Sequence, residues 1–140
     1  MPKERLERLP APLRLATPAP AHTAERDAML LVTVGDDDTP TIAMLSNDAL
    51  RWRNEETAEL TLYGDTRARQ NLQRRGLALV WFVLDGAAYS VGFAVERSTP
   101  RAEDDTSAFV LRVDGVWRDF NADAPLTAGP RYRASPQDSV

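Results

Sequence analysis

One uninterrupted apolar run, Leu77–Leu84, constrains the fold of this 140-residue chain more than any other feature. The run is too short to span a membrane, and its branched and aromatic side chains favour a β-strand over a buried helix. Because the run is apolar on both faces, the strand that it predicts must be covered on both. Asp85-Gly86 follows directly and is typical of a tight hairpin turn.

Further strands are predicted on either side of this run, from short apolar runs or from alternation of apolar and polar residues. They span residues 28–34, 41–46, 59–63, 89–96 and 109–113. Turn residues separate them: residues 35–40, with three consecutive aspartates, the polar loop 99–106, and Asp114-Gly115. The piece around Trp52 stays ambiguous. We therefore expect a mainly β chain, with six strands in a small, mainly antiparallel barrel.

Proline divides the chain into three parts. Eight of the ten prolines lie in residues 1–22 and 122–140, which contain no clear strand. We expect residues 1–22 to be a Pro-rich arm, with one or two helical turns over residues 3–9. Residues 122–140 are expected to be a loosely ordered tail anchored by Tyr132. Residues 23–121 are then the domain, and we predict that they fold without the arm and the tail.

One short helix is predicted between the third and fourth strands, over residues 66–75. Asp65 or Thr66 can cap its N-terminus and Gly76 its C-terminus. Arg67 and Arg69 fall in its first turn, where the helix dipole disfavours cations. A phosphate bound at that end would reverse this penalty, because backbone N–H groups and guanidinium groups would hold it together. The alternative interpretation is a solvated arginine-rich helix.

The spacing of polar residues gives this helix two different sides. Arg67, Gln70, Asn71 and Arg74 are spaced to share one face, whereas Ala68 and Leu72 share another. A helix of this kind is expected to lie across the mouth of the barrel, with its apolar edge packed inward.

Composition excludes several classes of function. A net charge of −4 and a pI of about 5.0 disfavour a general nucleic-acid binder. Without cysteine, and with His22 as the single histidine, a catalytic triad or a multi-histidine zinc site is not expected. The aspartates of residues 36–38 lack the ligand spacing of a calcium loop, so we assign them no metal. With no apolar segment of signal-peptide or membrane-span length, we expect a soluble cytoplasmic protein.

The order of these elements resembles the pyridoxamine 5′-phosphate oxidase-like, FMN-binding split β-barrel family, over about residues 30–95. The resemblance rests on a hairpin whose second strand follows Pro40, a helix that opens with Thr66-Arg67 and closes with Asn71-Leu72, and an apolar hairpin that leads to Val91-Gly92-Phe93-Ala94. It implies a six-stranded antiparallel split β-barrel with one short helix between strands 3 and 4.

The resemblance implies where the FMN phosphate would bind. In the family, a Ser or Thr and a basic pair open the helix and hold the phosphate. Thr66 and Arg67 occupy the first two of these positions, but the second basic position is Ala68 here. Arg69 or Gln70 would have to compensate, and Asn71 is a further expected contact.

The second strand of the family lines the isoalloxazine ring. This implies ring contacts from Met44, Leu45, Ser46 and Asn47. The oxidases themselves carry an Arg at the start of this strand and a Lys at its end, and residues 41–46 contain neither. Their absence argues against oxidation of pyridoxamine phosphate.

Family members usually form homodimers with flavin at the interface, which implies a dimer here. The second apolar face of Leu77–Leu84 supports it, because a small barrel has one interior and that face needs a cover. Trp81 and Trp117 are candidates to reach the partner's flavin, and Tyr63 is a similar candidate. The alternative for each aromatic residue is a core or interface position.

Three functions remain open from the sequence. The first is an FMN-dependent oxidoreductase that uses NAD(P)H or a small-molecule substrate, with no side chain that stands out as a general acid or base. The second is a non-enzymatic binder or sensor of flavin, deazaflavin or haem, although His22 is a weak candidate haem ligand. The third is an OB-like single-strand nucleic-acid binder using Trp52, Trp81 and the arginines, which the acidic net charge disfavours.

Overall fold

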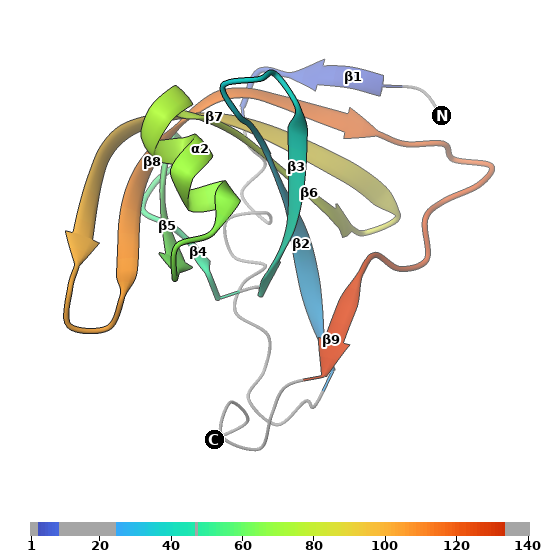
Figure 1. The fold of residues 1–140 in the computed structure, drawn as a ribbon. Coiled ribbons are helices and arrows are strands. Elements are labelled where there is room, and N and C mark those ends of the chain that lie inside the picture. The colour runs from blue at the N-terminus through green and yellow to red at the C-terminus, as the bar shows by residue number, and fades with distance from the viewer. Residues whose placement is uncertain (1–2, 9–24, 47, 134–140) are drawn as a thin grey trace.

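The computed structural model describes residues 3–8, 25–46 and 48–133 as a curled antiparallel sheet with one helix (Figure 1). Its elements in chain order are β1 (Lys3–Leu6), β2 (Glu25–Val34), β3 (Pro40–Ser46), β4 (Leu50–Trp52), β5 (Thr57–Tyr63), α2 (Arg67–Arg75), β6 (Leu77–Leu84), β7 (Ala87–Arg101), β8 (Thr106–Asp119) and β9 (Arg131–Arg133). Seven strands follow the order β3-β2-β6-β7-β8-β5-β4, while β1 pairs with β8 and β9 pairs with β2.

The main predictions for the fold are confirmed. The chain is mainly β, one helix separates the third and fourth predicted strands, and β6 has the predicted bounds Leu77–Leu84. The described residues form nine strands rather than six, because the ambiguous piece around Trp52 forms β4 and the short strands β1 and β9 lie in the regions predicted to be arm and tail. No helix within the described residues has the length and apolar character needed to cross a lipid bilayer.

Strands also occur in the regions that the sequence assigned to the arm and the tail. Lys3–Leu6 pairs with Val116–Asp119 of β8, so the helical turns predicted for residues 3–9 are wrong where the structure describes them. Arg131–Arg133 pairs with the start of β2, with Tyr132 opposite Arg26. Pairing with an available sheet edge outweighs local propensity in such short segments. Residues 9–22, His22 included, lie outside the described residues, and the dispensability of arm and tail stays a prediction.

β7 and β8 form a longer hairpin than the sequence predicts. β7 continues to Arg101 and β8 begins at Thr106, so half of the predicted loop 99–106 is strand and the turn is confined to residues 102–105. The predicted turn at Asp114-Gly115 is wrong: Val113 pairs with Phe93 and Gly115 with Gly92, which leaves Asp114 as the extra residue of a β-bulge.

The Trp117 ring explains why glycine occupies this bulge. A Cβ atom at position 115 would lie 2.5 Å from Cη2 of Trp117. The ring also lies 3.5 Å from the position of a Cβ atom at Gly92, the residue paired with Gly115. Trp117 therefore lies flat across two glycines on the outer face of the sheet.

The core lies inside the curl of the sheet. Its large fully buried apolar members come from six strands and the helix: Leu31, Leu50, Leu60, Leu72, Val80, Val91, Phe93, Phe109 and Leu111. α2 packs on β2, β3 and β6 and lies across the open side of the curl (Figure 1). Its apolar edge, Ala68 and Leu72, is buried as predicted, so the opposite face is left for polar contacts.

Replacing Gly115 tests the packing of Trp117. We expect Gly115→Ala to destabilise the fold by about 1–3 kcal/mol, because the added methyl group forces the indole ring away. Gly92→Ala is the matched control, since its Cβ would meet the same ring at an ordinary contact distance. Thermal denaturation of both variants measures the difference, and equal melting temperatures would contradict this account of the bulge.

Candidate functional site

The N-terminus of α2 has the geometry that the sequence predicts. Thr66 is the N-cap, and its hydroxyl accepts a hydrogen bond from the backbone N–H of Arg69 at 3.2 Å. Gly76 is the C-cap, with a left-handed φ of 67°. The first turn contains no acidic residue. The positive end of the helix dipole is therefore not compensated by a side chain of the helix itself.

The predicted polar face of α2 lines a shallow pocket of about 230 Å³ against the β2–β3 turn. Arg67, Gln70, Asn71 and Arg74 form one wall, and Gly35, Asp36, Asp37, Thr39 and Thr41 form the other. We name it the helix pocket. Arg67 is exposed, and among the described residues its guanidinium group has no hydrogen-bond or ion-pair partner.

Two of the three consecutive aspartates, Asp36 and Asp38, hold the other end of the helix. Asp36 forms an ion pair with Arg74 at 2.9 Å and Asp38 with Arg75 at 3.0 Å. Arg75 also donates to the carbonyl oxygen of Gly35 at 2.9 Å. The turn predicted to be solvated is thus exposed but ion-paired. No group of metal-ligating side chains that could hold an ion occurs among the residues described.

Asp37 has a different environment from its two neighbours. Its carboxylate accepts a hydrogen bond from the backbone N–H of Thr39 at 3.1 Å. This bond, followed by the Thr39 hydroxyl, holds the pKa of Asp37 below its usual value, and the charge of Arg67 acts in the same direction. Within the helix pocket, Arg74 is neutralised by its ion pair with Asp36. Arg67 has no such pair among the described residues and retains its hydrogen-bonding capacity.

Arg69 joins two loops instead of pointing into the helix pocket. Its Nη1 donates to the carbonyl oxygen of Gly64 at 2.8 Å and to Asp105 at 3.2 Å, and its side chain is 15% exposed. The N–H of Gly64 donates to the carbonyl oxygen of Asp105 at 2.9 Å. These bonds fix the β5–α2 turn against the tip of the β7–β8 hairpin. Gln70 donates to Asp65, the residue before the N-cap, at 3.1 Å.

Two of the predicted cofactor contacts have buried side chains. Asn71 donates from Nδ2 to the hydroxyl of Thr33 at 3.1 Å, inside the contact between helix and sheet. Leu45 belongs to the hydrophobic core. Their side chains stabilise the fold, and this burial was not evident from the spacing of polar residues along the helix.

Met44 and Trp81 lie on the outer face of the sheet. The strand register places Met44 opposite Leu30 and Leu30 opposite Trp81, in one row across β3, β2 and β6. A second row contains Ile42, Val32 and Leu79. Met44 is 58% exposed and Ile42 is 66% exposed. We name these six residues the outer strip, an apolar surface that the described part of the chain leaves partly uncovered.

Ser46 and Tyr63 line a second pocket, of about 300 Å³, between the end of β3, β4, β5 and the β7–β8 hairpin. We name it the hairpin pocket. Arg51 and Arg101 also line it, and neither was identified from the sequence. They are distant along the chain, and only the sheet order brings β4 and β7 to the same place. Asn47, another predicted contact, lies outside the described residues.

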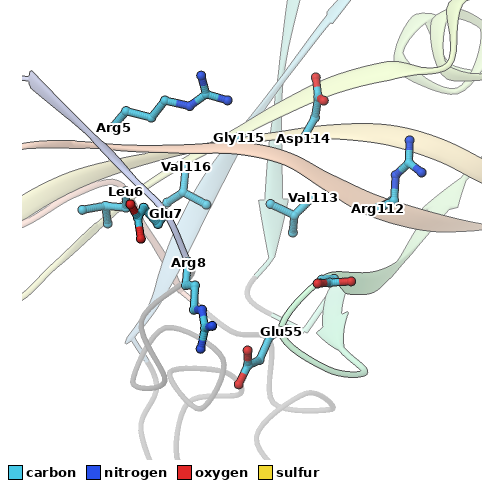
Figure 2. Close-up of a pocket in the computed structure, with 11 residues that line it drawn as sticks. Arg5, Leu6, Glu7, Arg8, Glu55, Arg112, Val113, Asp114, Gly115 and Val116 are labelled. Carbon is cyan, nitrogen blue, oxygen red and sulfur yellow. The ribbon is translucent and has the colours of Figure 1, made fainter.

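A larger cavity of about 820 Å³ lies between β1, the bulge of β8 and the β4–β5 turn (Figure 2). Leu6, Val113 and Val116 contribute its apolar lining, and guanidinium and carboxylate groups alternate around them (Figure 2). None of the described residues predicted to contact a cofactor lines this cavity.

Similarity to known proteins is detected by structure and not by sequence. No protein-family model and no curated protein matches the chain. Among solved structures, a candidate pyridoxamine 5′-phosphate oxidase from Lactobacillus delbrueckii superposes with a TM-score of 0.61 at 12% identity, over 80% of this chain and 97% of that one.

Two further structures have a similar fold. A candidate flavin reductase with a split-barrel domain from Shewanella frigidimarina gives a TM-score of 0.59 at 10% identity, over 80% of this chain and 83% of that one. An FMN-binding protein from Syntrophomonas wolfei gives a TM-score of 0.55 at 14% identity, over 70% of this chain and 78% of that one. The resemblance predicted from the sequence is therefore confirmed at the level of the fold: the chain is a split β-barrel.

The structural role of Asn71 can be measured directly. We expect Asn71→Ala to lower the free energy of unfolding by about 1–3 kcal/mol, because it leaves the buried Thr33 hydroxyl without its partner. Gln73→Ala, at an exposed position of the same helix, should change it by less than about 0.5 kcal/mol. Urea denaturation of the cofactor-free protein compares them. An unchanged urea midpoint for Asn71→Ala would contradict this structural role, and the Asn71 side chain would again be a candidate cofactor contact.

Proposed function

We propose that this chain binds FMN between the N-terminus of α2 and strand β3, as a flavin-dependent oxidoreductase. The observation that carries the proposal is Arg67, an exposed arginine with no hydrogen bond or ion pair among the described residues, at the N-terminus of a helix whose first turn contains no acidic residue. Such an arrangement favours a bound anion.

The residues of the helix pocket fit a phosphate group. The first-turn N–H groups of a helix have no intrahelical acceptors, and the Thr66 hydroxyl caps only that of Arg69. Thr39 and Thr41 line the same pocket. Ala68 is buried, so Arg67 carries the charge that two basic residues supply in the family. Because Arg69 is bound to Gly64 and Asp105, we assign it the positioning of this turn, with Gln70 as a weaker phosphate contact.

Strand β3 supports the position of the flavin ring. It is an edge strand that pairs only with β2 among the described strands, so its outer backbone groups are free to bind a polar ring edge. Met44 is exposed on it, and Ser46 at its end lines the hairpin pocket with Tyr63. The ring would then lie along β3, from the helix pocket toward the hairpin pocket.

We further propose that the flavin site is completed by a second copy of the chain. The outer strip adjoins β3 and exposes apolar side chains that a partner would cover. Trp81 belongs to this strip, and Trp117 lies on the same outer face, paired through Ser90. In this proposal Trp81 contacts the partner or its flavin, and Trp117, whose ring has the Arg5 guanidinium group 5.7 Å from its centroid, lies at the margin of the contact. The cytoplasmic location remains part of this proposal.

Bound flavin supplies hydride or electron transfer, while the residues of the chain bind, orient and shield it. NAD(P)H or a small molecule would be the electron donor. The second candidate is a non-enzymatic binder of flavin or deazaflavin. The similarity to an F420 reductase, with a TM-score of 0.54 at 16% identity over 64% of this chain and 88% of that one, supports a deazaflavin as an alternative ligand for either candidate. Oxidation of NAD(P)H by the flavin-loaded protein distinguishes the two.

Replacing Arg67 tests the phosphate site. We expect Arg67→Ala to weaken FMN binding about tenfold to a hundredfold, because a charge-assisted hydrogen bond contributes about 1.5–3 kcal/mol. Riboflavin, which lacks the phosphate, should bind both proteins equally. Titration of each flavin, followed by fluorescence quenching, gives the four affinities.

Arg74→Ala is the matched control, since it removes the same charge from the same helix face but from an arginine paired with Asp36. Its effect on FMN affinity should be smaller. Equal affinity of FMN for wild type and Arg67→Ala would overturn the phosphate site, and the helix would then be the solvated arginine-rich element that the sequence also allows.

The dimer is tested at the outer strip. We expect the wild-type chain to be a dimer at micromolar concentration and Met44→Glu to be a monomer, because the variant buries an unpaired carboxylate at the interface. Gln73→Glu, at an exposed position of α2, should remain a dimer. Light scattering measures the masses, and a monomeric wild type would remove the shared site.

A further inference from the structure

We propose that the hairpin pocket binds a small polar organic anion, with Arg51 and Arg101 on its carboxylate or phosphate group. Its role as the substrate of the neighbouring flavin rests on the function proposed above, whereas binding of the anion itself does not. The pocket is formed by segments that are far apart in the chain, and both arginines are exposed at its walls.

The hydrogen-bond partners in the pocket leave the arginines available. Within the part of the chain that the structure describes, neither Arg51 nor Arg101 has an ion pair or a side-chain hydrogen bond. Glu59 is paired with Arg53, which does not line the pocket. Asp48, Glu59 and Asp104 also line the pocket, but none of them is ion-paired with either arginine among the described residues. Two guanidinium groups without a described ion pair on one small pocket are complementary to an anionic group that accepts hydrogen bonds from both.

The carboxylates of the pocket restrict the ligand further. Asp48 accepts a hydrogen bond from the Ser46 hydroxyl at 2.6 Å, and Asp104 accepts one from the Thr106 hydroxyl at 2.6 Å. Each is bonded to its own loop, yet keeps acceptor capacity toward the pocket. The complementary ligand therefore carries one anionic group and, beside it, hydroxyl or amine donors for these aspartates. A highly charged polyanion would be repelled.

Size and position connect this pocket to the flavin site. A volume of about 300 Å³ is at the lower end for ligand sites, which suits a molecule of a few carbon atoms and not a dinucleotide. Tyr63 lies three residues before the N-cap Thr66, a distance of at most about 11 Å along the chain. The bonds of Arg69 to Gly64 and Asp105 hold the hairpin wall of the pocket to the turn that begins α2.

Titration of the full chain, free of flavin, tests the binding of anions. The probes are glycerate, glycerol 3-phosphate and uncharged glycerol, followed by calorimetry. We expect both anions to bind and glycerol not to bind. Arg51→Ala and Arg101→Ala should each weaken the binding of both anions at least tenfold. Arg97→Ala is the matched control, because Arg97 is an exposed arginine of the same strand as Arg101 but does not line the pocket. This variant should bind both anions with the affinity of wild type.

Preference for one anion identifies whether the pocket selects a carboxylate or a phosphate. The proposal is overturned if neither anion binds, or if binding is the same in wild type, Arg51→Ala and Arg101→Ala. It is also overturned if FMN competes with the anions and loses affinity in Arg51→Ala but not in Arg67→Ala, since the pocket would then hold the FMN phosphate.

Failure of the proposed function gives a different result. In one case FMN does not bind, the anions bind to wild type, and Arg51→Ala and Arg101→Ala no longer bind the anions. The anion site is then supported, but its role as a substrate site for flavin is refuted. If FMN binds through Arg67 and the anions do not bind, the flavin site stands and the anion site falls.

Discussion

The need to cover both faces of β6 determines most of this structure. β6 lies between β2 and β7, pairing with β7 along its whole length and with β2 at Leu79–Trp81, so its side chains must find apolar surroundings on both faces of the sheet. Ala78 and Val80 point into the core, which the curl of the sheet and the apolar edge of α2 close. Leu79 and Trp81 point to the outer strip, for which the described part of the chain offers incomplete cover. The same strand that builds the barrel therefore contributes to the outer strip, the surface that we propose a second copy covers.

The position of α2 follows from contacts at both of its ends. Arg74 and Arg75 pair with aspartates of the β2–β3 turn, and Arg69 ties the other end to the β7–β8 hairpin. Asn71 adds a buried hydrogen bond to β2. Most polar groups of this helix are thus used to hold it in place. Arg67 differs from them: it has no hydrogen-bond or ion-pair partner among the described residues, and for this reason we propose it, and not its neighbours on the same face, as the phosphate-binding residue.

Sequence patterns predicted the elements whose signals are local. The bounds of β6 and the caps of α2 follow from an apolar run, a Thr and a Gly, all read within a few residues. The bulge at Asp114-Gly115 was predicted as a turn, because the indole ring of Trp117, which favours glycine there, acts through the fold. Strand Lys3–Leu6 was missed because its pairing partner is more than 100 residues away.

The residues of the candidate site likewise divide into those that local sequence patterns predict and those that only the fold brings together. The helix pocket could be predicted, since its residues are spaced along one helix, but the burial of Asn71 and the loop contacts of Arg69 depend on distant segments. The hairpin pocket was not predicted as a pocket. Its arginines come from β4 and β7, and no spacing in the sequence relates them.

The most direct test of the central claim is the stoichiometry of FMN on the purified full chain. The chain is incubated with excess FMN and passed through a sizing column, and the flavin absorbance and the mass of the same peak are recorded. We expect a yellow dimer with one FMN for each chain. A colourless protein, or flavin bound to a monomer, would contradict a cofactor site formed at α2 and β3 and completed by a second copy.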